Sequence, residues 1–206
     1  MDERIYGNLT IDKARLCFLN WLDPDPKESF NAYARRMAAG IEDEEAILVG
    51  ISFGGMVALE IAGFRNIKQV ILISSIKQRS EMPLEMRLAG ALRLNRIFPV
   101  KKIQQSEAAY RIANRRLGAY TPEEQEFANT YRKTANLGYV NWSFDKILNW
   151  RNTHAFKNVI HIHGDRDRIF PIKHITPDYT IKEGTHMMVW NRATEISAII
   201  NKVLQL

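Results

Sequence analysis

The sequence predicts an α/β protein with a mostly parallel sheet and helices on its faces. Short apolar runs rich in β-branched residues alternate with segments of helical periodicity at both ends of the chain. These runs are apolar on both faces, as buried parallel strands are. From about residue 80 to residue 150, only helical patterns occur. We therefore expect one domain over residues 1–206, with a helical insertion at about 80–150.

The expected strands are bounded by turn residues or by helical patterns. They are Arg15–Leu19, Ala46–Val49, Gln69–Ile73, Asn158–Ile162 and, more weakly, Tyr179–Ile181. Apolar residues at helical spacing predict helices over residues 29–39, 54–64 and 193–204. Helices placed between successive strands form the βαβ pattern, which gives a parallel sheet.

Within the insertion, prolines and glycines mark the ends of the expected helices. The breaks fall at Pro83, Pro99, Thr121-Pro122 and Gly138. Thr121 is a good N-cap, because proline follows at the first helical position and two glutamates come next, where the helix dipole favours negative charge.

Composition excludes several classes of protein. The 206 residues are 46% hydrophobic and 25% charged, which is typical of a globular chain and not of a disordered one. Cys17 is the single cysteine, so a disulfide scaffold is excluded. No apolar run approaches the roughly 18–20 residues of a membrane span, and the first four residues lack the order of a signal peptide. We expect a cytoplasmic protein without an integral membrane segment.

Positive charge is concentrated in the middle of the chain. Residues 77–133 contain twelve basic and six acidic side chains, which accounts for the whole net charge of +6. Such a region could meet nucleic acid, an anionic membrane surface or an acidic substrate. Solvated helix faces explain it more simply, because no aromatic stacking motif or nucleic-acid module accompanies the charge. We therefore expect no nucleic-acid partner.

One short motif carries the strongest chemical signal. Gly50-Ile51-Ser52-Phe53-Gly54-Gly55 directly follows the expected strand Ala46–Val49 and directly precedes a helix. A serine in this place lies on a tight strand-to-helix turn, where flanking glycines avoid collisions and the hydroxyl points out over the sheet edge. The strand–turn–helix context makes the motif far more specific than its letters alone.

With this motif in this context, the chain resembles the α/β-hydrolase family. The resemblance implies two further residues in fixed order, an acid after a later strand and then a histidine. The segment from His161 to Pro171 looks like the family's Gly-x-x-Asp turn with an apolar-Pro pair, which places the acid at Asp167, with Asp165 as the main competitor. The segment Lys182–Met187 supplies the histidine, His186.

The resemblance also implies a role for each residue. Ser52 attacks an acyl carbonyl, His186 takes and returns the proton, and Asp167 holds the imidazole. The backbone N–H of Phe53 helps to bind the oxyanion. The implied function is a serine hydrolase of a small ester, thioester or related acyl substrate, without metal or organic cofactor. An acyltransferase with the same residues, or a non-catalytic binding protein of this fold, remains as an alternative.

A metal site competes for part of the same segment. His161, His163, Asp165 and Asp167 alternate as metal ligands do. The two histidines also alternate with isoleucines inside an expected strand, where they can simply pack at the end of the sheet. No further histidine pair completes a ligand shell, so we expect no metal.

The resemblance identifies residues 80–150 as a cap that covers the active site. Its last apolar residues are expected either to line an acyl pocket or to belong to the core, which is the commoner arrangement. They are Trp142, Phe144, Ile147, Leu148 and Trp150.

The N-terminal region departs from the family pattern. The family places further strands and a His-Gly or Gly-rich oxyanion loop before the nucleophile, and the stretch before Arg15 contains no such loop. Asp2–Tyr6 looks like the segment just after that loop. The resemblance therefore implies an N-terminally incomplete hydrolase domain. Either Met1 is an internal methionine of a longer natural protein, or the chain is truncated and catalytically damaged. A missing oxyanion donor typically costs about 10²–10³ in rate.

Overall fold

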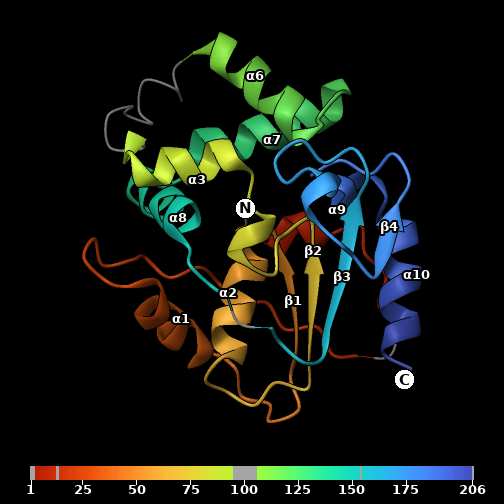
Figure 1. Cartoon of the computed structure of the whole chain (residues 1–206). Coiled ribbons are helices and arrows are strands. Elements are labelled where there is room, and N and C mark those ends of the chain that lie inside the picture. Colours follow the sequence, from red (N-terminus) through yellow and green to blue (C-terminus); the bar gives the residue numbers. More distant parts are fainter. Residues whose placement is uncertain (1–2, 13, 95–105, 154, 206) are drawn as a thin grey trace.

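Four parallel strands hydrogen-bond in the order β1-β2-β3-β4 (Figure 1). The computed structural model describes residues 3–12, 14–94, 106–153 and 155–205. The strands are β1 (Ile47–Ile51), β2 (Gln69–Ile73), β3 (Val159–Gly164) and β4 (Tyr179–Ile181). Four of the five expected strands are thus confirmed. Because all four run in one direction, the loops that follow them meet at one edge of the sheet.

Each face of the sheet is covered by its own apolar core. On β2, Val70 and Leu72 belong to one buried cluster, and Ile71 and Ile73 belong to the other. The first cluster includes α1 (Phe30–Ala38) and α2 (Phe53–Ala62), and the second includes α9 (Met188–Asn191), α10 (Ala193–Val203) and the 3-10 helix η1 (Glu3–Tyr6). Burial on both faces explains why the strands lack polar alternation.

Between β2 and β3 the chain leaves the sheet for a long helical excursion. Its elements are the 3-10 helix η2 (Arg79–Glu81), α3 (Leu84–Ala91), α6 (Glu107–Leu117), α7 (Pro122–Thr134) and α8 (Leu137–Asn149). In Figure 1, α3, α6 and α7 lie beyond the carboxyl ends of the strands. The helical insertion is therefore confirmed for the described residues. The expected break at Pro99 lies outside them.

The expected strand Arg15–Leu19 is wrong. The segment is irregular and joins no ladder of the described sheet. Its alternate apolar side chains stay largely in solvent, since Leu16 is 52% exposed and Phe18 50%. A β-rich composition gives a strand only where a partner strand supplies hydrogen bonds, and no described strand pairs with the outer edge of β1.

Most of the apolar residues at the end of the insertion belong to the core. Trp142, Leu148 and Trp150 are buried, and Trp142 lies with its ring centre 4.5 Å from that of Tyr33 on α1. Phe144 is 49% exposed. This cluster attaches α8 to α1 and α2, so the core interpretation holds for the three buried residues.

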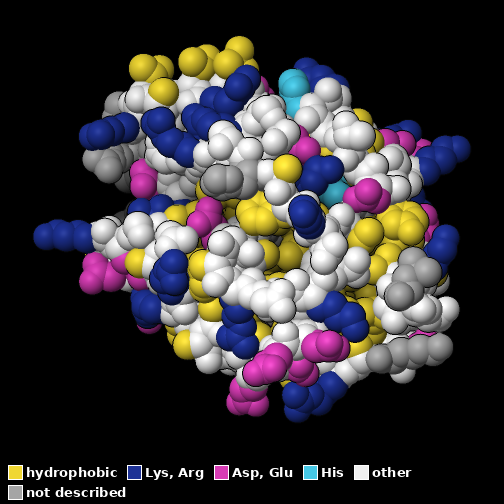
Figure 2. Space-filling model, turned by 60° about the horizontal axis from the view of Figure 1, so that its bottom comes forward, with side chains coloured by type: hydrophobic (Ala, Val, Ile, Leu, Met, Phe, Trp, Pro, Cys, Tyr) yellow, Lys and Arg dark blue, Asp and Glu magenta, His cyan; other side chains and the backbone are white. Residues whose placement is uncertain are grey.

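Charged side chains of both signs cover the surface in Figure 2. In Figure 2, Lys and Arg side chains are densest at the upper left, others lie at the left, right and bottom of the view, and acidic side chains gather toward the bottom.

Among the described helices, none has both the length and the apolar character needed to cross a bilayer.

The capping box at the start of α7 yields a stability prediction. The Thr121 hydroxyl accepts a hydrogen bond from the Glu124 N–H (3.2 Å), and the Glu124 carboxylate accepts one from the Thr121 N–H (2.9 Å). We expect Thr121→Ala to lower the free energy of unfolding by about 1 kcal/mol, measured by urea denaturation. Thr130→Ala, at an exposed position in the same helix, is the matched control and should change it by less than about 0.5 kcal/mol. Equal effects of the two changes would argue against the cap.

Candidate active site

Ser52 lies on a strained turn between β1 and α2. Its backbone angles are φ 52° and ψ −118°, a conformation that costs a non-glycine residue about 1–3 kcal/mol. Hydrogen bonds hold the turn on both sides. The Ser52 N–H donates to the carbonyl of Ile73 at the end of β2 (3.0 Å), and the Ser52 carbonyl accepts from Gly55 N–H (3.0 Å) and from the hydroxyl of Ser75 (2.7 Å).

The turn can form only because the backbone packs very closely around it. A Cβ atom on Gly50 would lie 2.5 Å from the Gly54 carbonyl oxygen, and one on Gly55 would lie 2.5 Å from the Ser75 hydroxyl. Gly54 differs, because the nearest atom to its added Cβ is on Trp21, at 3.7 Å. The close contacts therefore fall on Gly50 and Gly55.

Asp167 is held by the loop that follows β3. One carboxylate oxygen accepts hydrogen bonds from Ile169 N–H (2.8 Å) and Phe170 N–H (2.9 Å), and the other accepts from His186 Nδ1 (2.7 Å). Burial alone would raise the pKa of Asp167, but the adjoining His186 and these hydrogen bonds hold that pKa below its ordinary value. The carboxylate is therefore ionised at neutral pH.

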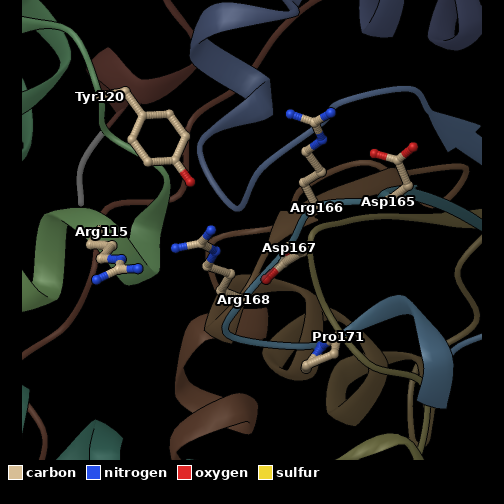
Figure 3. A pocket seen from close by; sticks show the side chains of 7 residues that line it. All are labelled: Arg115, Tyr120, Asp165, Arg166, Asp167, Arg168 and Pro171. Carbon is tan, nitrogen blue, oxygen red and sulfur yellow. The ribbon is translucent and has the colours of Figure 1, made fainter.

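His186 follows β4 and joins the other two residues. Its Nδ1 faces Asp167, and its Nε2 lies 2.9 Å from the Ser52 hydroxyl oxygen. Because an ionised carboxylate only accepts, the ring proton is on Nδ1, and Nε2 is left to accept the Ser52 proton. The three predicted residues, each from a different loop, thus form one chain of hydrogen bonds. Asp165 is exposed, and its carboxylate points away from that of Asp167 (Figure 3).

Phe53 begins α2, and the first N–H groups of a helix have no acceptor within the helix. Its amide, directly after Ser52, is therefore available to an oxygen atom placed above the turn. The Phe53 side chain is fixed by aromatic packing, with ring centres 5.3 Å from Phe30 and 5.8 Å from Trp21. An arrangement of this kind can transfer a proton from serine to histidine and bind a developing oxyanion.

Two supporting residues were not foreseen from the sequence. The role of Ser75 in holding the serine turn depends on contact between β2 and α2, for which no local pattern exists. His163 Nε2 lies 2.8 Å from the Phe170 carbonyl oxygen and 3.7 Å from the Asp167 carboxylate, so it supports the acid loop from beneath. The His-x-His alternation in the sequence drew attention to His163, but it did not predict that His163 contacts the loop that bears Asp167.

His161 and His163 pack inside the protein. Both are fully buried on β3, with ring centres 5.2 Å apart. In the described part of the chain, no group of three or more His, Cys, Asp or Glu side chains is placed to hold a metal ion. The burial of both rings fits the packing interpretation.

The comparison with protein families identifies the fold. Residues 15–198 match the model of the alpha/beta hydrolase family. The chain belongs to the alpha/beta hydrolase family. No curated protein gives a significant match to this hydrolase.

Several solved structures resemble this hydrolase in fold. The malate-bound esterase from Thermogutta terrifontis is 15% identical with a TM-score of 0.65, and the alignment covers 99% of this hydrolase and 85% of the esterase. A meta-cleavage product hydrolase from Pseudomonas fluorescens is 13% identical with a TM-score of 0.62, and the alignment covers 87% of this chain and 72% of that hydrolase. A bromoperoxidase from Bacillus anthracis is 13% identical with a TM-score of 0.61, and the alignment covers 100% of this chain and 88% of the bromoperoxidase. These similarities show a common fold.

The glycines around Ser52 should differ in their tolerance to a methyl group. We expect Gly50→Ala to lower the free energy of unfolding by about 1–3 kcal/mol, because backbone atoms occupy the space of the new Cβ. Gly54→Ala should leave it unchanged or raise it by up to about 1 kcal/mol, since the site is open and alanine favours the helix. Urea denaturation of both variants measures the difference. Equal destabilisation would contradict this account of the turn.

The buried histidines predict a loss of stability in acid. Burial, with smaller contributions from His163 and Lys77, lowers the pKa of His161 to about 3, whereas an unfolded histidine titrates near 6.5. Below about pH 6.5 this histidine is protonated in the unfolded chain but stays neutral in the folded chain. The free energy of unfolding therefore falls by about 1.4 kcal/mol per pH unit for this residue, down to about pH 3. In His161→Leu, the slope of unfolding free energy against pH between 6 and 4 should be shallower by about that amount. Identical slopes would refute the assignment.

Proposed function

We propose that this protein is a serine hydrolase that cleaves a small ester or thioester through a covalent acyl intermediate on Ser52. The observation that carries the proposal is the continuous contact from Asp167 through His186 to Ser52, at 2.7 and 2.9 Å. Membership of the alpha/beta hydrolase family and an esterase among the structural neighbours support a hydrolytic reaction.

In the first half of the reaction, Ser52 Oγ attacks the acyl carbonyl carbon while its proton passes to His186 Nε2. The Phe53 N–H donates to the oxyanion of the tetrahedral intermediate. Asp167 keeps the imidazole in the productive tautomer and stabilises its charged form. Collapse of the intermediate breaks the bond to the leaving alcohol or thiol, which takes the proton from His186.

In the second half, water replaces the leaving group. His186 Nε2 removes a proton from the water as the oxygen attacks the acyl carbon, and a second tetrahedral intermediate forms. Its collapse releases the carboxylic acid and returns the proton to Ser52 Oγ, which restores the starting state. An acyltransferase would use the same residues with an alcohol or thiol in place of water.

The decisive test is covalent labelling by a fluorophosphonate probe, read by intact mass. We expect one adduct on the wild-type chain and none on Ser52→Ala, because only an activated serine reacts at a useful rate. Turnover of 4-nitrophenyl acetate should fall by about 10⁴-fold or more in Ser52→Ala, and by about 10⁴-fold in Asp167→Asn, which holds the wrong tautomer.

The matched control is Ser80→Ala, an exposed serine outside the site, which should label as the wild type does. An adduct that persists in Ser52→Ala, or no adduct on the wild type, would contradict the proposal and favour a binding role. Product analysis with added alcohol separates hydrolysis from acyl transfer, since a transferase forms the new ester in preference to the free acid.

A further inference from the structure

A cavity beside the Asp167 loop has a distinctive lining. Its volume is about 610 Å³, within the range of small-molecule sites. Arginines supply much of the lining, with Arg115 contributed by α6 and with Arg166 and Arg168 on either side of Asp167. Tyr120 completes the wall next to α6 (Figure 3). The cavity therefore lies between the helical insertion and the loop that holds the acid.

Two of these arginines form no ion pair with another described residue. Arg166 forms an ion pair with Glu183 at 2.8 Å, and Arg192 lies 3.6 Å from the same carboxylate. Among the described residues, neither Arg115 nor Arg168 forms an ion pair. In Figure 3 the two guanidinium groups face one another across the cavity, and the Tyr120 hydroxyl points toward the same space. Two exposed guanidinium groups that line one cavity, beside a further donor, favour an anion between them.

The insertion side of this cavity is fixed to the histidine loop. At the end of α6, Gly118 has φ 81°, and an added Cβ would lie 2.2 Å from Cβ of Thr185, the residue before His186. The Glu124 carboxylate accepts hydrogen bonds from the Tyr120 N–H (2.7 Å) and from the Asn191 side chain on α9 (2.7 Å). Tyr120 and the end of the helix that bears Arg115 are therefore anchored to the segment around His186.

The backbone of the opposite wall is also held by hydrogen bonds. Arg168 follows Asp167 directly, and the next two N–H groups, of Ile169 and Phe170, both donate to the Asp167 carboxylate. Both arginines are thus carried by segments that also position Asp167 and His186. Asp167, which hydrogen-bonds His186, itself lines the cavity, so an anion bound there lies beside the hydrogen-bonded residues of the candidate site.

The acidic groups at the cavity do not cancel this charge. Asp167 is engaged by His186 and two backbone N–H groups. The Asp165 carboxylate lies on the side of the cavity away from Arg115 in Figure 3. It would repel an anion placed near itself, and this favours the end formed by Arg115, Tyr120 and Arg168.

We propose that Arg115 and Arg168, with the Tyr120 hydroxyl, bind a carboxylate or phosphate group carried by the acyl substrate. The inference rests on the proposed function, and it narrows the substrate class to anionic esters or thioesters. The arginines bind and orient the substrate, and they take no part in bond breaking.

The test compares matched substrates. Mono-4-nitrophenyl esters of dicarboxylic acids of graded chain length are compared with the same esters ending in a primary amide, and an ester ending in a phosphate separates the two anions. We expect kcat/KM for the best anionic ester to exceed that of its amide by about 10-fold or more. Arg115→Gln and Arg168→Gln should each remove most of this preference, with less than about a 2-fold effect on the amides.

The matched control is Arg116→Gln, which removes the same charge from an exposed neighbour that does not line the cavity. It should keep the preference. Equal kcat/KM for anionic and neutral esters in the wild type, or an equal fall for both in the arginine variants, would overturn the proposal. The rate of labelling by a neutral fluorophosphonate should be unchanged in both arginine variants, and this confirms that their folding and the Ser52 site are intact.

A readout without turnover separates the two proposals. Binding of a dicarboxylic acid monomethyl ester to Ser52→Ala, measured by calorimetry, should be weakened about 10-fold by Arg168→Gln, whereas Arg116→Gln should have no effect. If the wild type fails to label but this binding persists, the hydrolase proposal fails and the anion site stands. If the protein labels but no arginine-dependent binding is found, the anion site fails alone.

Discussion

The positive φ of Ser52 is the constraint on which the rest of the site depends. It turns the chain so sharply that the serine hydroxyl stands above the sheet edge, where residues from other loops reach it. Its cost of about 1–3 kcal/mol is offset by neighbours that the fold supplies. The carbonyl of Ile73, the hydroxyl of Ser75 and the N–H of Gly55 all bind the backbone of this one residue. The pairing of β1 with β2 therefore supports the candidate site as well as the core.

The parallel sheet then brings the other two residues to the same edge. Asp167 and His186 follow β3 and β4, and parallel strands place their carboxyl ends together. Backbone hydrogen bonds tie the two loops to each other, since Asp165 N–H donates to Ile181 and Arg166 N–H donates to Gly184. These backbone hydrogen bonds fix the position of Asp167 relative to His186 independently of any contact with Ser52. This explains how an ionised, buried carboxylate is kept in contact with a ring nitrogen.

Much of the fold and of the candidate site could be predicted from the sequence. The turn at Ser52 and the start of α7 at Thr121 depend on local glycine and capping patterns, which a short stretch of sequence contains. Asp167 and His186 came from resemblance to a family, which fixes chain order. The wrong strand at Arg15–Leu19 shows the limit, because pairing depends on a partner far away in the sequence. Ser75 was missed for the same reason, since only the packing of α2 on β2 gives it a role.

The cavity between α6 and the acid loop illustrates how, in our proposal, a helical insertion would confer specificity on a fixed fold. Arg115 and Arg168 are 53 positions apart in sequence, and neither belongs to a motif. They face each other because Gly118 lets α6 end directly against Thr185, and because Glu124 links the start of α7 to α9. A change in the insertion can therefore alter which group is recognised without disturbing the hydrogen bonds among Ser52, His186 and Asp167. In our proposal, the residues that recognise the substrate and those that react with it are far apart in the sequence, and the packing of the insertion on the sheet brings them together.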